Sequence, residues 1–134
     1  MADPFIGRWK MIPEKNDYES GLPPLDGLYI IKADGKGYEI IMEWTQPDGD
    51  HMSMSYKAVP DNQIQPSDAP GVDNTKMTRV DEKTLDSEAI KDGVVIAYAR
   101  RSLSKDNNTM TVTQTGTNSY GGQFTNTSVY VRLE

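Results

Sequence analysis

The chain has 134 residues, no cysteine and a single histidine, so it can form neither a disulfide nor a zinc site built from thiolates or several imidazoles. Its net charge of −6 argues against nucleic acids and anionic membranes as partners, because both bind clustered lysine and arginine. No apolar run reaches the ~20 residues of a spanning helix. We expect one domain over residues 1–134 with no membrane insertion, no metal and no cofactor.

The first predicted strand, residues 3–12, places Phe5 and Trp9 on one face, with Gly7 between them where a larger side chain would crowd the indole. Met1 is followed at once by Ala2 and Asp3, which is not the start of a signal peptide. Two origins fit this start: a cytoplasmic protein, or an exported one whose signal peptide is absent from this chain.

Nine segments are predicted as strands, because alternating or β-prone residues lie between turn residues. These segments are 3–12, 28–33, 38–45, 52–58, 75–80, 85–90, 94–103, 109–115 and 124–133. Asp-Gly pairs at 34–35, 48–49 and 92–93 are strong hairpin signals.

The two least regular segments are 13–27 and 59–74, both rich in proline and polar residues. The first is expected to be a loop with at most a helical turn near 14–18, and the second allows a short strand at 63–65. No segment has a convincing helical period. The sequence therefore predicts an all-β protein, a single antiparallel up-and-down β-barrel of about 8–10 strands with little or no helix. A sandwich is the alternative.

The Gly7-x-Trp9 motif, followed by successive hairpins, resembles the calycins, the superfamily of lipocalins and fatty-acid-binding proteins. The final segment, 126–134, is similar to the last strand of fatty-acid-binding proteins, which carries Arg-x-Tyr facing the ligand. The chain keeps that tyrosine as Tyr130 but has Ser128 in place of the arginine, so the family's anion clamp is not intact. By the same resemblance, Arg101 points into the barrel.

Over its whole length the chain is more similar to bacterial proteins described as lipocalin-like. The matching parts are 5–10, Pro23-Pro24, 79–81 with Thr84-Leu85, 100–106 and 109–113. This resemblance implies a lipocalin-like fold and almost nothing about chemistry.

Methionine and aromatic residues recur on the faces that would point inward, and such residues line adaptable cavities. Trp44 could stack on a planar ligand, Arg79 or Arg101 could hold an anionic or carbonyl group, and neutral polar residues could orient the ligand. The candidate ligand-binding residues are Tyr38, Met42, Trp44, Met52, Met54, Tyr56, Met77, Arg79, Arg101, Met110, Gln114, Ser128 and Tyr130. The competing interpretation is a solid core, with one of Arg79, Arg101 and Arg132 lying over Trp9.

Three functions remain open. The first is binding of a small hydrophobic or amphipathic molecule inside the barrel. The second is a metal-free enzyme of isomerase, cyclase or lyase type, in which a tyrosine acts as acid and an arginine stabilises an anion. The third is a ligandless barrel whose outer surface binds a protein. We expect a monomer or a weak dimer.

Overall fold

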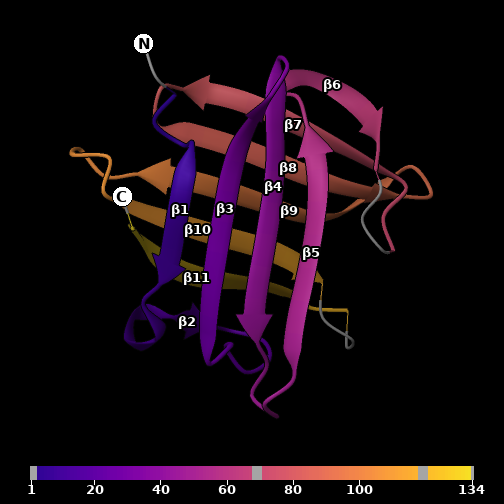
Figure 1. Cartoon of the computed structure of the whole chain (residues 1–134). Helices are drawn as coiled ribbons and strands as arrows, with labels where there is room; N and C mark the ends of the chain where they lie inside the picture. The colour runs from indigo at the N-terminus through magenta and orange to yellow at the C-terminus, as the bar shows by residue number, and fades with distance from the viewer. Residues whose placement is uncertain (1–2, 68–70, 118–120, 134) are drawn as a thin grey trace.

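A computed structural model of the chain describes residues 3–67, 71–117 and 121–133, and the strands in these ranges form one antiparallel sheet (Figure 1). The strands are β1 (Gly7–Met11), β2 (Asp17–Tyr18), β3 (Asp26–Asp34), β4 (Gly37–Thr45), β5 (His51–Ala58), β6 (Asp61–Pro66), β7 (Asn74–Asp81), β8 (Thr84–Lys91), β9 (Val94–Leu103), β10 (Thr109–Thr117) and β11 (Gln123–Arg132). A short 3₁₀ turn, η1 (Pro13–Lys15), follows β1. No helix among the described residues is long and apolar enough to cross a membrane.

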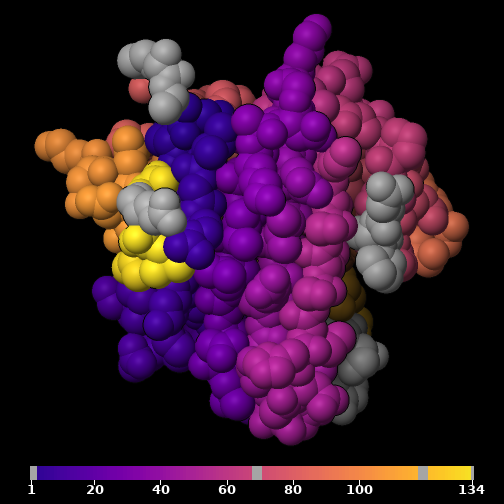
Figure 2. Space-filling view, viewed as in Figure 1, coloured from indigo at the N-terminus to yellow at the C-terminus, as the bar shows by residue number. Residues whose placement is uncertain are grey.

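The strands follow the order β5-β4-β3-β1-β11-β10-β9-β8-β7-β6, and β2 pairs with β11 beside this path. Strand β1 joins the two halves, because it pairs with β3 on one side and β11 on the other. Figure 1 shows β1, β3, β4 and β5 as one layer that crosses the layer of β7 to β11. In the space-filling view, the first layer forms a continuous wall (Figure 2). The protein is thus an all-β, nearly closed antiparallel barrel of the predicted calycin type.

Most strand positions agree with the predicted hairpins, and two strands go beyond the prediction. Strand β2 is a two-residue strand inside the predicted loop, and it exists because residues 17–18 pair with β11. Strand β6 covers Asp61–Pro66, where the sequence allowed only a short strand at 63–65. The helical turn expected near 14–18 is present only as the three-residue 3₁₀ turn η1. Parts of the predicted connections, 68–70 and 118–120, lie outside the described residues, as do Met1 and Ala2.

One end of the barrel is filled by Phe5 and Trp9, both fully buried. The Trp9 indole Nε1 donates a hydrogen bond to the Phe5 carbonyl oxygen at 3.1 Å. The guanidinium of Arg132 lies 4.2 Å from the centre of the Trp9 ring, so Arg132 is the arginine that forms the structural cation–π pair. Gly7 has a φ of +147°, and a Cβ there would lie 2.6 Å from Arg132 Nη1. The glycine therefore makes room for the arginine rather than for the indole.

Candidate ligand-binding site

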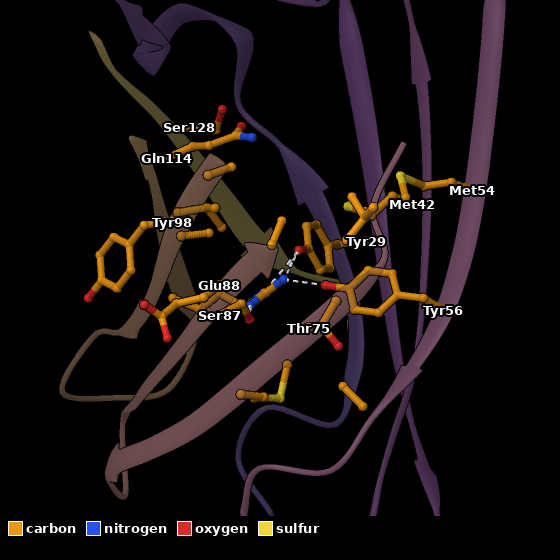
Figure 3. Close-up of a pocket in the computed structure, with 18 of the residues that line it drawn as sticks. Tyr29, Met42, Met54, Tyr56, Thr75, Ser87, Glu88, Tyr98, Gln114 and Ser128 are labelled. Carbon is orange, nitrogen blue, oxygen red and sulfur yellow. Dashed lines mark hydrogen bonds between the residues drawn. The ribbon is translucent and has the colours of Figure 1, made fainter. Parts of the chain in front are cut away.

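The barrel contains a cavity of about 260 Å³ whose described wall includes Tyr29 but neither Phe5 nor Trp9 (Figure 3). Its wall combines methionines, small apolar residues and tyrosines with a few polar groups. The described residues of the wall are Tyr18, Tyr29, Met42, Met54, Tyr56, Ala58, Val72, Thr75, Lys76, Met77, Ser87, Glu88, Ala89, Ala97, Tyr98, Ala99, Arg101, Val112, Gln114, Asn126, Ser128 and Tyr130. A mostly apolar wall with a few convergent polar groups is the usual composition of a small-molecule site.

Arg101 of β9 is the one charged residue of this wall that is buried, since the residue is only 2% exposed, among the described residues. Its Nε and Nη2 donate to the Tyr29 hydroxyl at 2.9 and 2.7 Å. Nη2 also donates to the Tyr56 hydroxyl at 2.7 Å, and Nη1 donates to Ser87 Oγ at 2.7 Å. Figure 3 shows Tyr29 and Tyr56 converging on this guanidinium from the opposite wall.

All of the hydrogen-bond acceptors of Arg101 are neutral hydroxyl groups. Among the described residues, no carboxylate lies within ion-pair distance of its guanidinium. The nearby carboxylate of Asp86 instead accepts hydrogen bonds from Arg100 Nε and Nη2 at 2.7 and 2.8 Å. A buried cation without an anionic partner is costly, because burial removes its hydration. Arg101 therefore provides an uncompensated positive charge at which an anionic group would be stabilised.

The tyrosines around Arg101 are neutral hydrogen-bonding groups. Burial raises the pKa of the Tyr29 hydroxyl from 10 to about 12, although the charge of Arg101 opposes the shift. Burial also raises the pKa of Tyr130, whose ring packs edge-on against Tyr29 with ring centres 5.3 Å apart. Tyr29 and Tyr56 accept hydrogen bonds from Arg101 and also hydrogen-bond to each other, which uses one of their two protons and leaves the other for a ligand.

A short segment, residues 17–20, runs antiparallel along β11 beside the cavity, and we call it the strap. Asn126 holds it: Asn126 Oδ1 accepts from the Glu19 and Ser20 amides at 2.9 and 3.2 Å, and Nδ2 donates to the Ser20 carbonyl at 3.1 Å. Tyr18 of the strap lines the cavity, and its hydroxyl lies 3.1 Å from Ser128 Oγ. The strap thus adds a polar side chain to the wall.

Of the candidate residues named from the sequence, a majority meet around this one cavity. They are Met42, Met54, Tyr56, Met77, Arg101, Gln114, Ser128 and Tyr130. They meet because alternate residues of neighbouring strands point to the same side of the sheet.

The other five candidates do not line the cavity, which corrects the sequence-based set. Tyr38, Arg79 and Met110 are on inward faces, but they lie at the filled end of the barrel. There the Arg79 guanidinium and the Tyr38 hydroxyl both bind Asp3 Oδ2, with the Arg79 bond at 2.8 Å, and Met110 is fully buried in the core.

Trp44 and Met52 form a cross-strand pair near the ends of β4 and β5 that project past the second layer (Figure 1). They border a shallow groove on the outside instead of the cavity. A planar ligand within the cavity would therefore not stack on Trp44.

Tyr18, Tyr29 and Ser87 are site residues that the sequence analysis did not find. For Tyr29 a signal existed, because it alternates with Gly27 and Ile31 on the third strand and so shares their face. For Tyr18 and Ser87 no signal existed, because their positions depend on the long-range pairing of β2 and on the direction of Arg101.

The wall offers little else that could perform chemistry or hold a metal. Glu88 is the only carboxylate among the described wall residues, and its Oε1 lies 3.9 Å from Lys76 Nζ. In the described ranges no three His, Cys, Asp or Glu side chains gather as metal ligands. What the arrangement can do is bind an anion at Arg101 and donate hydrogen bonds to it.

The fold and the cavity place the chain among the antiparallel barrels of the calycin fold. No family model and no curated protein matches the sequence. Among solved structures, the chain is similar to the zebrafish ileal bile acid-binding protein crystallised with cholic acid, with a TM-score of 0.62 and 12% sequence identity. The match covers 97% of this chain and 99% of that one. At this identity the likeness is one of fold.

Proposed function

We propose that the protein binds a small amphipathic molecule inside the barrel, with an anionic group of the ligand held by Arg101. The single observation that carries this proposal is the buried guanidinium of Arg101, which has neutral hydroxyl partners only. An anion bound there would supply the missing countercharge and would form charge-assisted hydrogen bonds.

The apolar part of the ligand would lie against the methionines and alanines of the wall. A volume of about 260 Å³ is slightly below the ~300–1,000 Å³ of usual ligand pockets, which favours a compact molecule. The cholic acid complex of the zebrafish protein supports an amphipathic acid as the general type, since that barrel has the same fold. Met42, Met54 and Met77 can adapt to the shape of the apolar part, because methionine is flexible.

The class of protein, its domain, its oligomeric state and its partners are proposed from the sequence. We infer a lipocalin-like protein of the bacterial kind, because its start at 5–10 and the segment 100–106 resemble that group. One domain over 1–134, a monomer or weak dimer, and no nucleic-acid partner also remain our expectations. An enzymatic role would have Glu88 as its one carboxylate base among the described residues of the wall, and Glu88 Oε1 lies 3.9 Å from Lys76 Nζ.

The test compares the binding of octanoate and octanol by calorimetry. Replacing Arg101 by methionine should weaken octanoate binding by about 10- to 100-fold, because a hydrogen bond to a charged group contributes ~1.5–3 kcal/mol. Octanol binding should change by less than about threefold, because octanol carries no charge. The result checks whether the positive charge, rather than the cavity alone, selects the ligand.

Arg100→Met is the matched control. Arg100 is the preceding residue, but its side chain is on the exposed face and pairs with Asp86. This variant should bind octanoate as the unaltered protein does. Equal losses for octanoate and octanol in a folded Arg101→Met protein would refute the role of Arg101 as an anion anchor.

A further inference from the structure

Tyr130 leaves one polar group inside the cavity without a partner. The residue is 8% exposed and lines the cavity, and its hydroxyl has no hydrogen-bond partner among the described residues. Burial is the main cause of its raised pKa, so the hydroxyl stays protonated and can donate. The hydroxyl faces the cavity and has a free proton and free lone pairs, which makes this position a point of attraction for a polar ligand atom.

The part of the wall formed by Tyr18, Ser128, Gln114 and Asn126 carries polar groups without charge. The Tyr18 and Ser128 hydroxyls lie 3.1 Å apart, and one hydrogen bond between them leaves a second proton and several lone pairs unused. Ser128 is buried, and Gln114 and Asn126 complete this part of the wall. Figure 3 shows Ser128 and Gln114 together at one end of the pocket, apart from Tyr29 and Tyr56.

The strand register fixes how far this group lies from the anion anchor. Arg101 pairs with Val112, and Val112 pairs with Ser128, so the three residues form one row across β9, β10 and β11. Two strand spacings separate Arg101 from Ser128, which is about 10 Å between their Cα atoms. One compact molecule can therefore reach both groups at once.

We infer that Tyr130, Ser128 and Tyr18 form a second polar subsite, which receives a neutral hydroxyl or carbonyl group of the same ligand. This inference rests on the proposed function and makes it narrower. The ligand class becomes compact hydroxy or oxo acids, with the anion at Arg101 and the neutral polar group at a distance from it. Unsubstituted acids would leave the Tyr130 hydroxyl unpaired.

The experiment measures the affinity of hexanoate, octanoate and decanoate, each beside its ω-hydroxy counterpart, by calorimetry. At one chain length the hydroxy acid should bind about 3- to 10-fold more tightly than its parent, the gain expected for one well-placed hydrogen bond. Tyr130→Phe and Ser128→Ala should each reduce this ratio between the hydroxy acid and its parent acid. Ser55→Ala, on the exposed outer face of β5, should leave it unchanged.

The possible results separate this inference from the proposed function. If the parent acids bind through Arg101 but no hydroxy acid binds more tightly, the second subsite is refuted and the anion anchor stands. The second subsite is also refuted if hydroxy acids still bind more tightly than their parent acids in both Tyr130→Phe and Ser128→Ala. If no acid binds, the proposed function itself fails, and the subsite fails with it.

Discussion

At the scale of single residues, three arginines on the inner faces of strands differ in what they bind. Arg132 donates to the Ile6 and Asn107 carbonyl oxygens and stacks on Trp9. Arg79 pairs with the carboxylate of Asp3. Arg101 alone among these three has neither a carbonyl nor a carboxylate partner. The first two arginines are therefore satisfied by the protein, while the third has a charge left for a ligand.

Tyr29 provides a test of the environment around Arg101 through the pH dependence of stability. Its folded-state pKa of about 12 exceeds its ordinary value of 10, so above pH 10 the unfolded chain loses this proton while the folded chain keeps it. The contribution to stability is fully present below pH 10 and is lost as the pH rises towards 12. We expect the free energy of unfolding to fall by about 2–3 kcal/mol over this window from Tyr29 alone.

The measurement is urea unfolding at several pH values between neutral pH and about pH 12, for the unaltered protein and for Tyr29→Phe. The difference between the two proteins should shrink as the pH rises, because only the unaltered protein carries this titrating group. A difference that is the same at every pH would contradict a buried, neutral Tyr29.

At the scale of elements, the strap lies beside the cavity although its regular secondary structure is only the two-residue strand β2. Its two-residue strand β2 pairs with Asn126 and Thr127 of β11, and the side chain of Asn126 adds three hydrogen bonds. Short elements with few buried contacts open more easily than the core. Asn126 provides three of the hydrogen bonds that hold the strap, beside those of Glu19 to the Thr125 amide and of Tyr18 to Ser128.

Asn126→Ala should release the strap. We expect hydrogen exchange of the Glu19 and Ser20 amides to accelerate by about fivefold or more, because both amides lose their acceptor. Global stability should fall by only about 1 kcal/mol. Thr127→Ala is the control, because residue 127 points to the other side of β11. Unchanged exchange in Asn126→Ala would show that backbone pairing alone holds the strap.

The strands that the sequence predicted well are those with local signals. Asp-Gly turns and alternating residues located the hairpins of β3–β4, β4–β5 and β8–β9, because both signals depend on neighbours in the chain. β2 has no such signal, since it exists only through pairing with a strand more than a hundred residues away. β6 was obscured by Pro66 and by Asn62, which has a φ of +62°.

At the scale of the whole molecule, the barrel is filled at one end and hollow in the middle. Phe5, Trp9 and Met110 occupy the filled end, with Arg132 above the indole. The alternation of residues predicts which side chains point inward, but it does not give their height along the barrel. This is why Tyr38 and Arg79 were grouped from sequence with residues such as Met54, although they lie in the filled part.

The central claim is that an amphipathic acid lies inside the barrel, and NMR with ¹³C-labelled methionine methyl groups tests it most directly. Titration with octanoate should produce nuclear Overhauser contacts from the ligand chain to Met54 and Met77, which line the cavity. Met52, which borders the outer groove, should show none. Contacts to Met52 without contacts to Met54 and Met77 would contradict binding inside the barrel.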